Sequence, residues 1–118
     1  MLNTNLTHLL SQNDHKTILE ENENVMVCCG RMGPMCIPVY ESMEELEGEY
    51  KNVKFADMEF DSHDAHVIRN LPECRNFQGL PFVVYYKNGK VVKATSSIQS
   101  RDQITEILDE YLVNSVKA

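Results

Sequence analysis

The sequence predicts an α/β fold, a three-layer sandwich in which a mixed, four-stranded sheet lies between helices on both faces. Apolar runs at 25–29 and 53–60 enclose a helical pattern, and strand–helix–strand implies a parallel pair joined by a right-handed crossover. Two β-rich runs, 82–86 and 91–94, flank Asn88-Gly89. Asn-Gly between such runs is the strongest short signal for an antiparallel hairpin, because both central residues of its turn need positive φ.

The first half of the chain predicts two helices around the first strand. Apolar residues at helical spacing indicate a short amphipathic helix over 6–20. Residues 25–29, Val-Met-Val-Cys-Cys, form a continuous apolar run with turn signals on both sides, which is typical of a strand buried on both faces. From Cys36 onward, apolar residues recur at helical spacing and glutamates occupy the opposite face.

The second half predicts the remaining elements. Residues 53–60 alternate between apolar and polar, with a slip at Ala56-Asp57, and predict the second strand. Residues 61–77 give a weaker helical pattern that Pro72 interrupts. After the hairpin, Ser100 and a glutamine three residues later form a helix-start signature ahead of the closing amphipathic helix.

Charge and composition exclude several classes of partner. The net charge of −7 and the pI of about 5.0 oppose binding to nucleic acid or to an anionic membrane surface. No apolar run approaches the roughly 20 residues that a membrane-spanning helix needs, and the N-terminus lacks the basic and apolar regions of a signal peptide. We therefore expect a cytoplasmic, monomeric protein with one domain, 1–118. In that compartment cysteines are more often free, catalytic or metal-bound than paired in structural disulfides.

The C-terminal half resembles the thioredoxin family. Gly79-Leu80-Pro81-Phe82, followed by Val-Val-Tyr-Tyr-Lys-Asn-Gly-Lys-Val-Val, is similar to that family's block of Gly-Ile-Pro-Thr, an apolar strand and Lys-Asn-Gly. Pro38 matches the proline that kinks the family's second helix. The resemblance covers about 6–111 and implies a thioredoxin-like sandwich.

The resemblance also implies roles for residues near Pro81. In the family this proline is cis and packs against the redox cysteines, and the backbone before it pairs with the substrate like an added strand. Gly79, Leu80 and Pro81 would then form the substrate-binding segment. The alternative is that Pro81 merely begins an edge strand.

The active-site half departs from the family. There is no Cys-x-x-Cys in the chain and no tryptophan. The family's buried acid, which takes a proton from the resolving thiol, should lie on the strand at 25–29, where nothing acidic occurs. Cys28 or Asn24 takes its place, depending on the register.

Three of the four cysteines lie within nine residues, at the junction of the first strand and the next helix. Cys29 ends the strand, and Gly33-Pro34 predicts a helix start that places Cys36 in the first turn. The loop between them is long enough to bring the two Cα atoms to the roughly 5.5 Å that a disulfide needs. Cys29 and Cys36 are therefore candidates for a reversible pair, and the alternative is two buried thiols acting as small apolar residues. Cys28 should point to the opposite face of the strand.

These observations leave three functions open. One is an atypical thioredoxin-like oxidoreductase that acts on protein disulfides in cell redox homeostasis, with an unidentified electron donor and no cofactor. There Cys29 and Cys36 are catalytic, and Cys74 is either a regulatory thiol or an ordinary, partly exposed one. The second is a redox-inactive module that binds a protein partner in the Leu80-Pro81 groove.

The third function is a soft-metal carrier. A dense set of sulfur ligands suits Cu(I), zinc or an iron–sulfur cluster, although its spacing matches no familiar signature. The set comprises Met26, Cys28, Cys29, Met32, Met35 and Cys36. Separately, His63 and His66 lie three apart with Asp61 and Asp64 nearby. That pattern permits a metal pair, although such residues usually form a solvated polar face. We assign no metal to the sequence.

Overall fold

The computed structural model describes residues 2–113, and its centre is a five-stranded sheet in the order β1-β3-β2-β4-β5. β2 is parallel to β3 and antiparallel to β4, and β4 and β5 form the predicted hairpin. The strands are β1 (Thr7–His8), β2 (Asn24–Gly30), β3 (Lys54–Glu59), β4 (Phe82–Lys87) and β5 (Lys90–Ser96). The mixed sheet agrees with the prediction, but it has one strand more than the four expected.

The additional strand comes from the segment that the sequence predicted as one helix over 6–20. Thr7–His8 pairs with β3 in parallel, and α1 begins only at Gln12 (α1, Gln12–Glu21). Ser11 sets this boundary, since its extended backbone precedes the helix and its side chain accepts a hydrogen bond from the Asp14 N–H.

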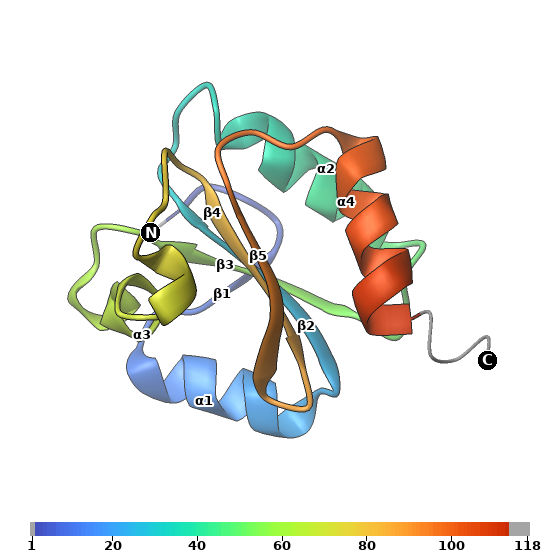
Figure 1. Ribbon diagram of the computed structural model, residues 1–118, viewed down its shortest axis with the longest axis horizontal. Coiled ribbons are helices and arrows are strands. Elements are labelled where there is room, and N and C mark those ends of the chain that lie inside the picture. Colours follow the sequence, from blue (N-terminus) through green and yellow to red (C-terminus); the bar gives the residue numbers. More distant parts are fainter. Residues whose placement is uncertain (1, 114–118) are drawn as a thin grey trace.

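Helices cover both faces of the sheet, with α1 and α3 on one face and α2 and α4 on the other (Figure 1). Their bounds are α2 (Ile37–Glu47), α3 (His66–Arg69) and α4 (Arg101–Ile107), and a π-helical turn, Leu108–Val113, continues α4. Ser100 forms the predicted capping box at the start of α4, because its side chain and that of Gln103 each accept the other's backbone N–H. Within residues 2–113, no helix has the length and apolar character needed to cross a bilayer.

The region 61–77 is less regular than one helix. It contains η1 (His63–Ala65), α3 and η2 (Pro72–Cys74). Leu71 has an extended backbone, with φ −65° and ψ 142°, because the residue before a proline is pushed out of the helical region. The hairpin turn agrees with the sequence, since Asn88 and Gly89 have φ values of 54° and 79°.

The sheet separates two apolar cores. The α2/α4 core includes Met26, Cys28, Phe55 and Tyr85 from the strands, and the α1/α3 core includes Val25, Val27, Cys29 and Val84. Every residue of β2 is buried, which confirms the prediction of a strand covered on both faces. Because successive side chains of a strand point to opposite faces, adjacent residues of β2 enter different cores.

Candidate functional site

Gly30 marks the point where the cysteine loop, α2 and the proline segment meet. A Cβ atom at this position would lie 2.8 Å from Tyr40 Oη, 2.9 Å from Cys36 Sγ and 3.3 Å from Pro81 Cβ. Only glycine leaves room for these three groups to converge on the end of β2. The peptide bond between Leu80 and Pro81 is cis, so the structure has the bond geometry that the resemblance implied.

Cys36 lies at the N-cap of α2 and is only 2% exposed. The backbone N–H of Arg31 donates a hydrogen bond to its sulfur, with a nitrogen–sulfur distance of 3.5 Å. The Tyr40 hydroxyl donates to the Arg31 carbonyl at 3.2 Å, which holds the loop against α2. The helix begins at Ile37 rather than at Gly33-Pro34. Before it, Gly33 forms a turn in which its carbonyl accepts from the N–H groups of Cys36 and Ile37.

The four cysteines divide between the two faces of the sheet. Cys28 and Cys36 belong to the α2/α4 core, whereas Cys29 and Cys74 belong to the α1/α3 core. Cys28 thus points away from Cys29, as the strand alternation predicted. The structure does not bring Cys29 and Cys36, the pair suggested by the sequence, into one core, because α2 covers only the face to which Cys28 points. All four are free thiols.

Burial makes the two β2 thiols hard to ionise. It raises the pKa of Cys28 well above its ordinary value, and the neighbouring Cys36 adds to this rise. Burial also raises the pKa of Cys29 to about 12, with a further contribution from Cys74. Since the thiolate is the reactive form, few molecules carry a nucleophilic sulfur at Cys28 or Cys29 near neutral pH.

Sequence reasoning missed a buried acid, Asp57, because it considered only β2. Asp57 lies on β3 as the registered neighbour of Cys28 and is 1% exposed. Thr4 Oγ1 donates a hydrogen bond to one carboxylate oxygen, and His8 Nδ1 lies 2.8 Å from the other. Burial raises the pKa of Asp57, and these two hydrogen bonds oppose the rise. The available signal was the slip at Ala56-Asp57, which places an acid among the apolar residues of a strand.

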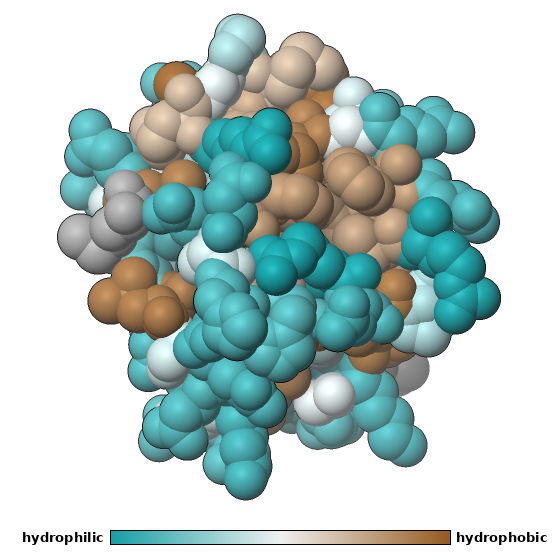
Figure 2. All heavy atoms as spheres, turned by 90° about the vertical axis from the view of Figure 1, so that its left-hand side faces the viewer, coloured by the Kyte–Doolittle hydropathy of each residue, from teal (hydrophilic) through white to brown (hydrophobic). Residues whose placement is uncertain are grey.

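A groove with a volume of about 500 Å³ opens beside Cys36. Of the proposed substrate-binding residues, Gly79 and Leu80 line it, while Pro81 is buried beside Gly30. Its lining is Arg31, Gly33, Pro34, Met35, Cys36, Phe60, Phe77, Gln78, Gly79 and Leu80. Apolar residues gather near the top of the face shown in Figure 2, at the end of the molecule where the loop between β2 and α2 lies.

Exposed apolar side chains and a single ion pair characterise this groove. Met35 is 44% exposed and Phe77 39% exposed. Arg31 donates two hydrogen bonds to Asp61, at 2.7 and 2.9 Å, so its charge is matched within the protein. The groove therefore offers an apolar surface, and the charge of Arg31 at its edge is neutralised by Asp61.

The sulfur ligands suggested for a soft metal do not form one group. Met26 is buried in the α2/α4 core and Cys29 lies across the sheet. Met32 and Met35 are on the exposed loop. The face alternation of β2 divides the set, so the structure gives no support to a site that uses all six.

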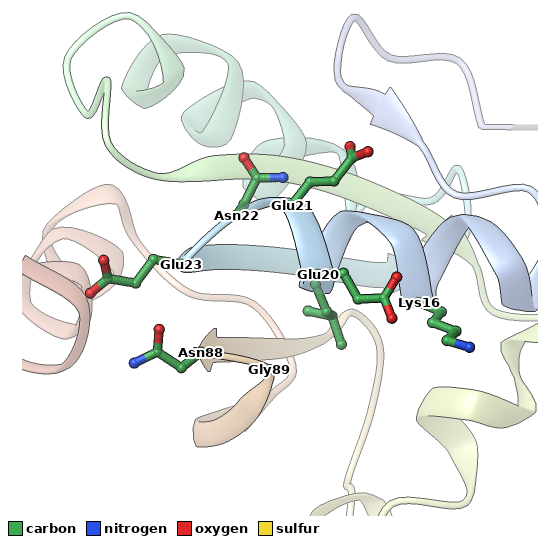
Figure 3. A pocket seen from close by; sticks show the side chains of 8 residues that line it. Lys16, Glu20, Glu21, Asn22, Glu23, Asn88 and Gly89 are labelled. Atoms are coloured by element: carbon green, nitrogen blue, oxygen red, sulfur yellow. The ribbon is translucent and has the colours of Figure 1, made fainter.

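A second cavity, of about 570 Å³, lies at the opposite end of the sheet, between the end of α1 and the hairpin turn. Its labelled side chains, including Lys16, Glu23 and Asn88, point in different directions rather than toward a common point (Figure 3). None of the cysteines lines it. The groove beside Cys36 is therefore the stronger candidate for a functional site.

Solved structures of thioredoxins are similar to this chain over most of its length. The thioredoxin of Plasmodium falciparum has a TM-score of 0.73 and 23% sequence identity, covering 90% of this chain and 99% of that one. Thioredoxin f2 of Chlamydomonas reinhardtii has a TM-score of 0.74 and 16% identity, covering 91% and 96%. Mitochondrial thioredoxin 3 of Saccharomyces cerevisiae has a TM-score of 0.70 and 19% identity, covering 88% and 94%. Neither a protein-family model nor a curated protein matches the sequence. The agreement in structure shows that the chain has the thioredoxin fold.

Proposed function

We propose that this protein is an atypical thiol–disulfide oxidoreductase that acts on protein disulfides, with Cys36 as the thiol that attacks the substrate. The observation that carries the proposal is the position of Cys36. Of the four cysteines it is the one that lines the groove, and its sulfur converges with Pro81 on Gly30. An extended substrate lying along Leu80 would bring its disulfide to the wall of the groove that Cys36 forms, and the sulfur, which is 2% exposed, would have to be uncovered for the attack.

The reaction proceeds through a mixed disulfide. The Cys36 thiolate attacks one sulfur of the substrate disulfide, forming a bond to it and releasing the other substrate sulfur as a thiolate. A second thiol of the protein then attacks the Cys36 sulfur, which releases the reduced substrate and leaves a disulfide within the protein. A dithiol donor protein returns both cysteines to the reduced form.

Cys28 is the resolving thiol that the packing favours. It shares the α2/α4 core with Cys36, and it is fully buried, which suits a thiol that only has to reach another residue of the protein. Asp57 is its registered neighbour on β3, and we assign to this carboxylate the role of accepting the Cys28 proton. For Cys29 to resolve, as the sequence suggested, its side chain would have to leave the opposite core.

Insulin reduction and disulfide mapping test this assignment. We expect Cys36→Ser to abolish reduction and Cys28→Ala to stop turnover with the substrate held on Cys36 as a mixed disulfide. Cys29→Ala and Cys74→Ser are the matched controls and should retain activity. Peptide mapping after mild oxidation should show a Cys28–Cys36 link. Full activity of Cys36→Ser would contradict the proposal, and a Cys29–Cys36 link would restore the pairing suggested by the sequence.

A second function, a redox-inactive module that binds a protein partner, is favoured by the exposed Met35 and Phe77 in the groove. The two functions differ in their thiol chemistry. Four thiols that stay reduced through mild oxidation, together with no insulin reduction, would favour the binding module. In either case, the net charge of −7 favours protein partners over nucleic acid, and four free thiols suit a reducing compartment such as the cytoplasm.

A further inference from the structure

We propose that His63, Asp64 and His66 form a binding site for a divalent transition-metal ion of the Zn²⁺ class. One ligand atom from each residue, two imidazole nitrogens and a carboxylate oxygen, lies within 4.8 Å of the other two. The three belong to the segment after β3, and the group includes no cysteine. The site does not depend on the proposed redox function.

Local backbone structure brings the two histidines together. η1 (His63–Ala65) runs directly into α3, so residues three apart fall on the same side of the chain. The two imidazole rings lie with their centroids 5.7 Å apart. Histidines at this spacing on a loop without helical structure would not be held on one side in this way.

Hydrogen bonds already orient two of the three ligands. His66 Nδ1 lies 3.1 Å from the His63 carbonyl oxygen, so Nδ1 carries the proton and donates it, and Nε2 keeps its lone pair for a metal. This is the usual support for a metal-binding histidine. One oxygen of Asp64 accepts the backbone N–H of Gln12 at 2.9 Å, which fixes the carboxylate while leaving lone pairs on both oxygens.

Two imidazole nitrogens and one carboxylate oxygen favour a transition-metal ion over calcium or magnesium. Imidazole nitrogen suits zinc, copper and nickel, whereas calcium and magnesium prefer a shell made of oxygen. Metal–nitrogen bonds of about 2.0–2.1 Å place tetrahedral ligand atoms about 3.3 Å apart, so the side chains must close slightly around the ion. Three protein ligands leave the fourth position to water.

The surrounding charges permit a cation here. Arg69 is a cationic side chain that contacts this segment, but its guanidinium is directed at the backbone carbonyls of Phe60, Ser62 and His63. The net charge of −7 draws cations to the protein as a whole. Because Asp64 also holds the start of α1, a bound ion would link the segment after β3 to that helix and stabilise the folded chain.

Cobalt(II) is the probe for this site, because its visible absorption reports the geometry and the ligands of a zinc-like site. The reduced, chelator-treated full chain is titrated with Co²⁺ without oxygen, and bound Co²⁺ is then displaced with Zn²⁺. We expect about one equivalent to bind with a tetrahedral spectrum, and no thiolate charge-transfer band. The thermal midpoint should rise with Zn²⁺ concentration.

Matched variants locate the site. His66→Gln and Asp64→Asn should each weaken Co²⁺ binding roughly tenfold or more, while His15→Gln, a histidine on α1, should bind like the parent protein. Cys36→Ser should also bind normally. Equal affinity in His66→Gln and the parent would overturn the proposal. So would a thiolate band that Cys36→Ser removes, because the ion would then sit on the cysteines.

Discussion

Cys28 on β2 and Asp57 on β3 are registered neighbours in a parallel strand pair, and both are almost completely buried. The carboxylate is held by Thr4 and His8, which come from the segment that precedes α1. An acid beside a buried thiol thus exists in this protein, on the strand next to the one where the resemblance placed it. Burial of Asp57 also makes the stability of the folded chain depend on pH, whether or not the protein is active.

Asp57→Asn should change how stability depends on pH. Burial raises the pKa of Asp57 in the folded state, so between the unfolded value of about 4 and that raised value the folded chain binds more protons. Stability is therefore lost as pH rises through this window. Urea unfolding from pH 4 upward should show this fall in the parent protein and a smaller one in Asp57→Asn. Parallel curves for the two proteins would contradict the assignment.

Gly30→Ala should destabilise the protein by about 1–3 kcal/mol, because the added methyl overlaps Tyr40 Oη and Cys36 Sγ. Gly33→Ala is the matched control: nothing lies within 4 Å of a Cβ at that position, so the free energy of unfolding should change by less than about 1 kcal/mol. Chemical denaturation measures both. Equal losses in the two variants would show that Gly30 is not a point of close contact.

Tyr40→Phe should loosen the cysteine loop, since the hydroxyl donates to the Arg31 carbonyl. We expect a loss of about 1 kcal/mol in the free energy of unfolding and faster alkylation of Cys36. Tyr85→Phe provides the comparison, because the Tyr85 hydroxyl is buried without a hydrogen-bond partner among residues 2–113, and its removal should cost nothing. An unchanged Cys36 alkylation rate in Tyr40→Phe would mean that this bond does not hold the loop.

Cys29 should react slowly with iodoacetamide in the folded protein. With a pKa of about 12, about one molecule in 10⁴ carries the thiolate at pH 8, and the side chain is also fully buried. Peptide mapping over time should show alkylation of Cys29 more than a hundredfold slower than in the urea-unfolded chain. Similar rates in the two states would place Cys29 near the surface.

Most of the fold could be predicted because its signals are local. The buried run of β2, the Asn88-Gly89 turn and the Ser100 capping box each depend on a few neighbouring residues. The strand at Thr7–His8 could not be predicted in this way. A two-residue edge strand is defined by its hydrogen bonds to β3, which is distant in sequence.

The candidate site was predicted only in part, because it also depends on contacts between residues that are distant in sequence. Cys36 and Leu80 were identified from the sequence, and they line the same groove. The partner of Cys36 depends on which face of β2 is covered by α2, and that choice belongs to the packing of the whole sheet. Alternation along the strand could separate Cys28 from Cys29, but it could not say which of them shares a core with Cys36.

Because the cysteines are divided between two cores, the sheet keeps the thiols of one core apart from those of the other. Neighbouring residues of β2 supply one thiol to each side, and neither can reach across while the strand remains paired with β3 and β4. We expect an oxidant that enters one core to modify the thiols of that core before those of the other. A disulfide between a cysteine of one core and a cysteine of the other would require part of β2 to move, so the backbone hydrogen bonds of the sheet also limit which sulfur atoms can combine.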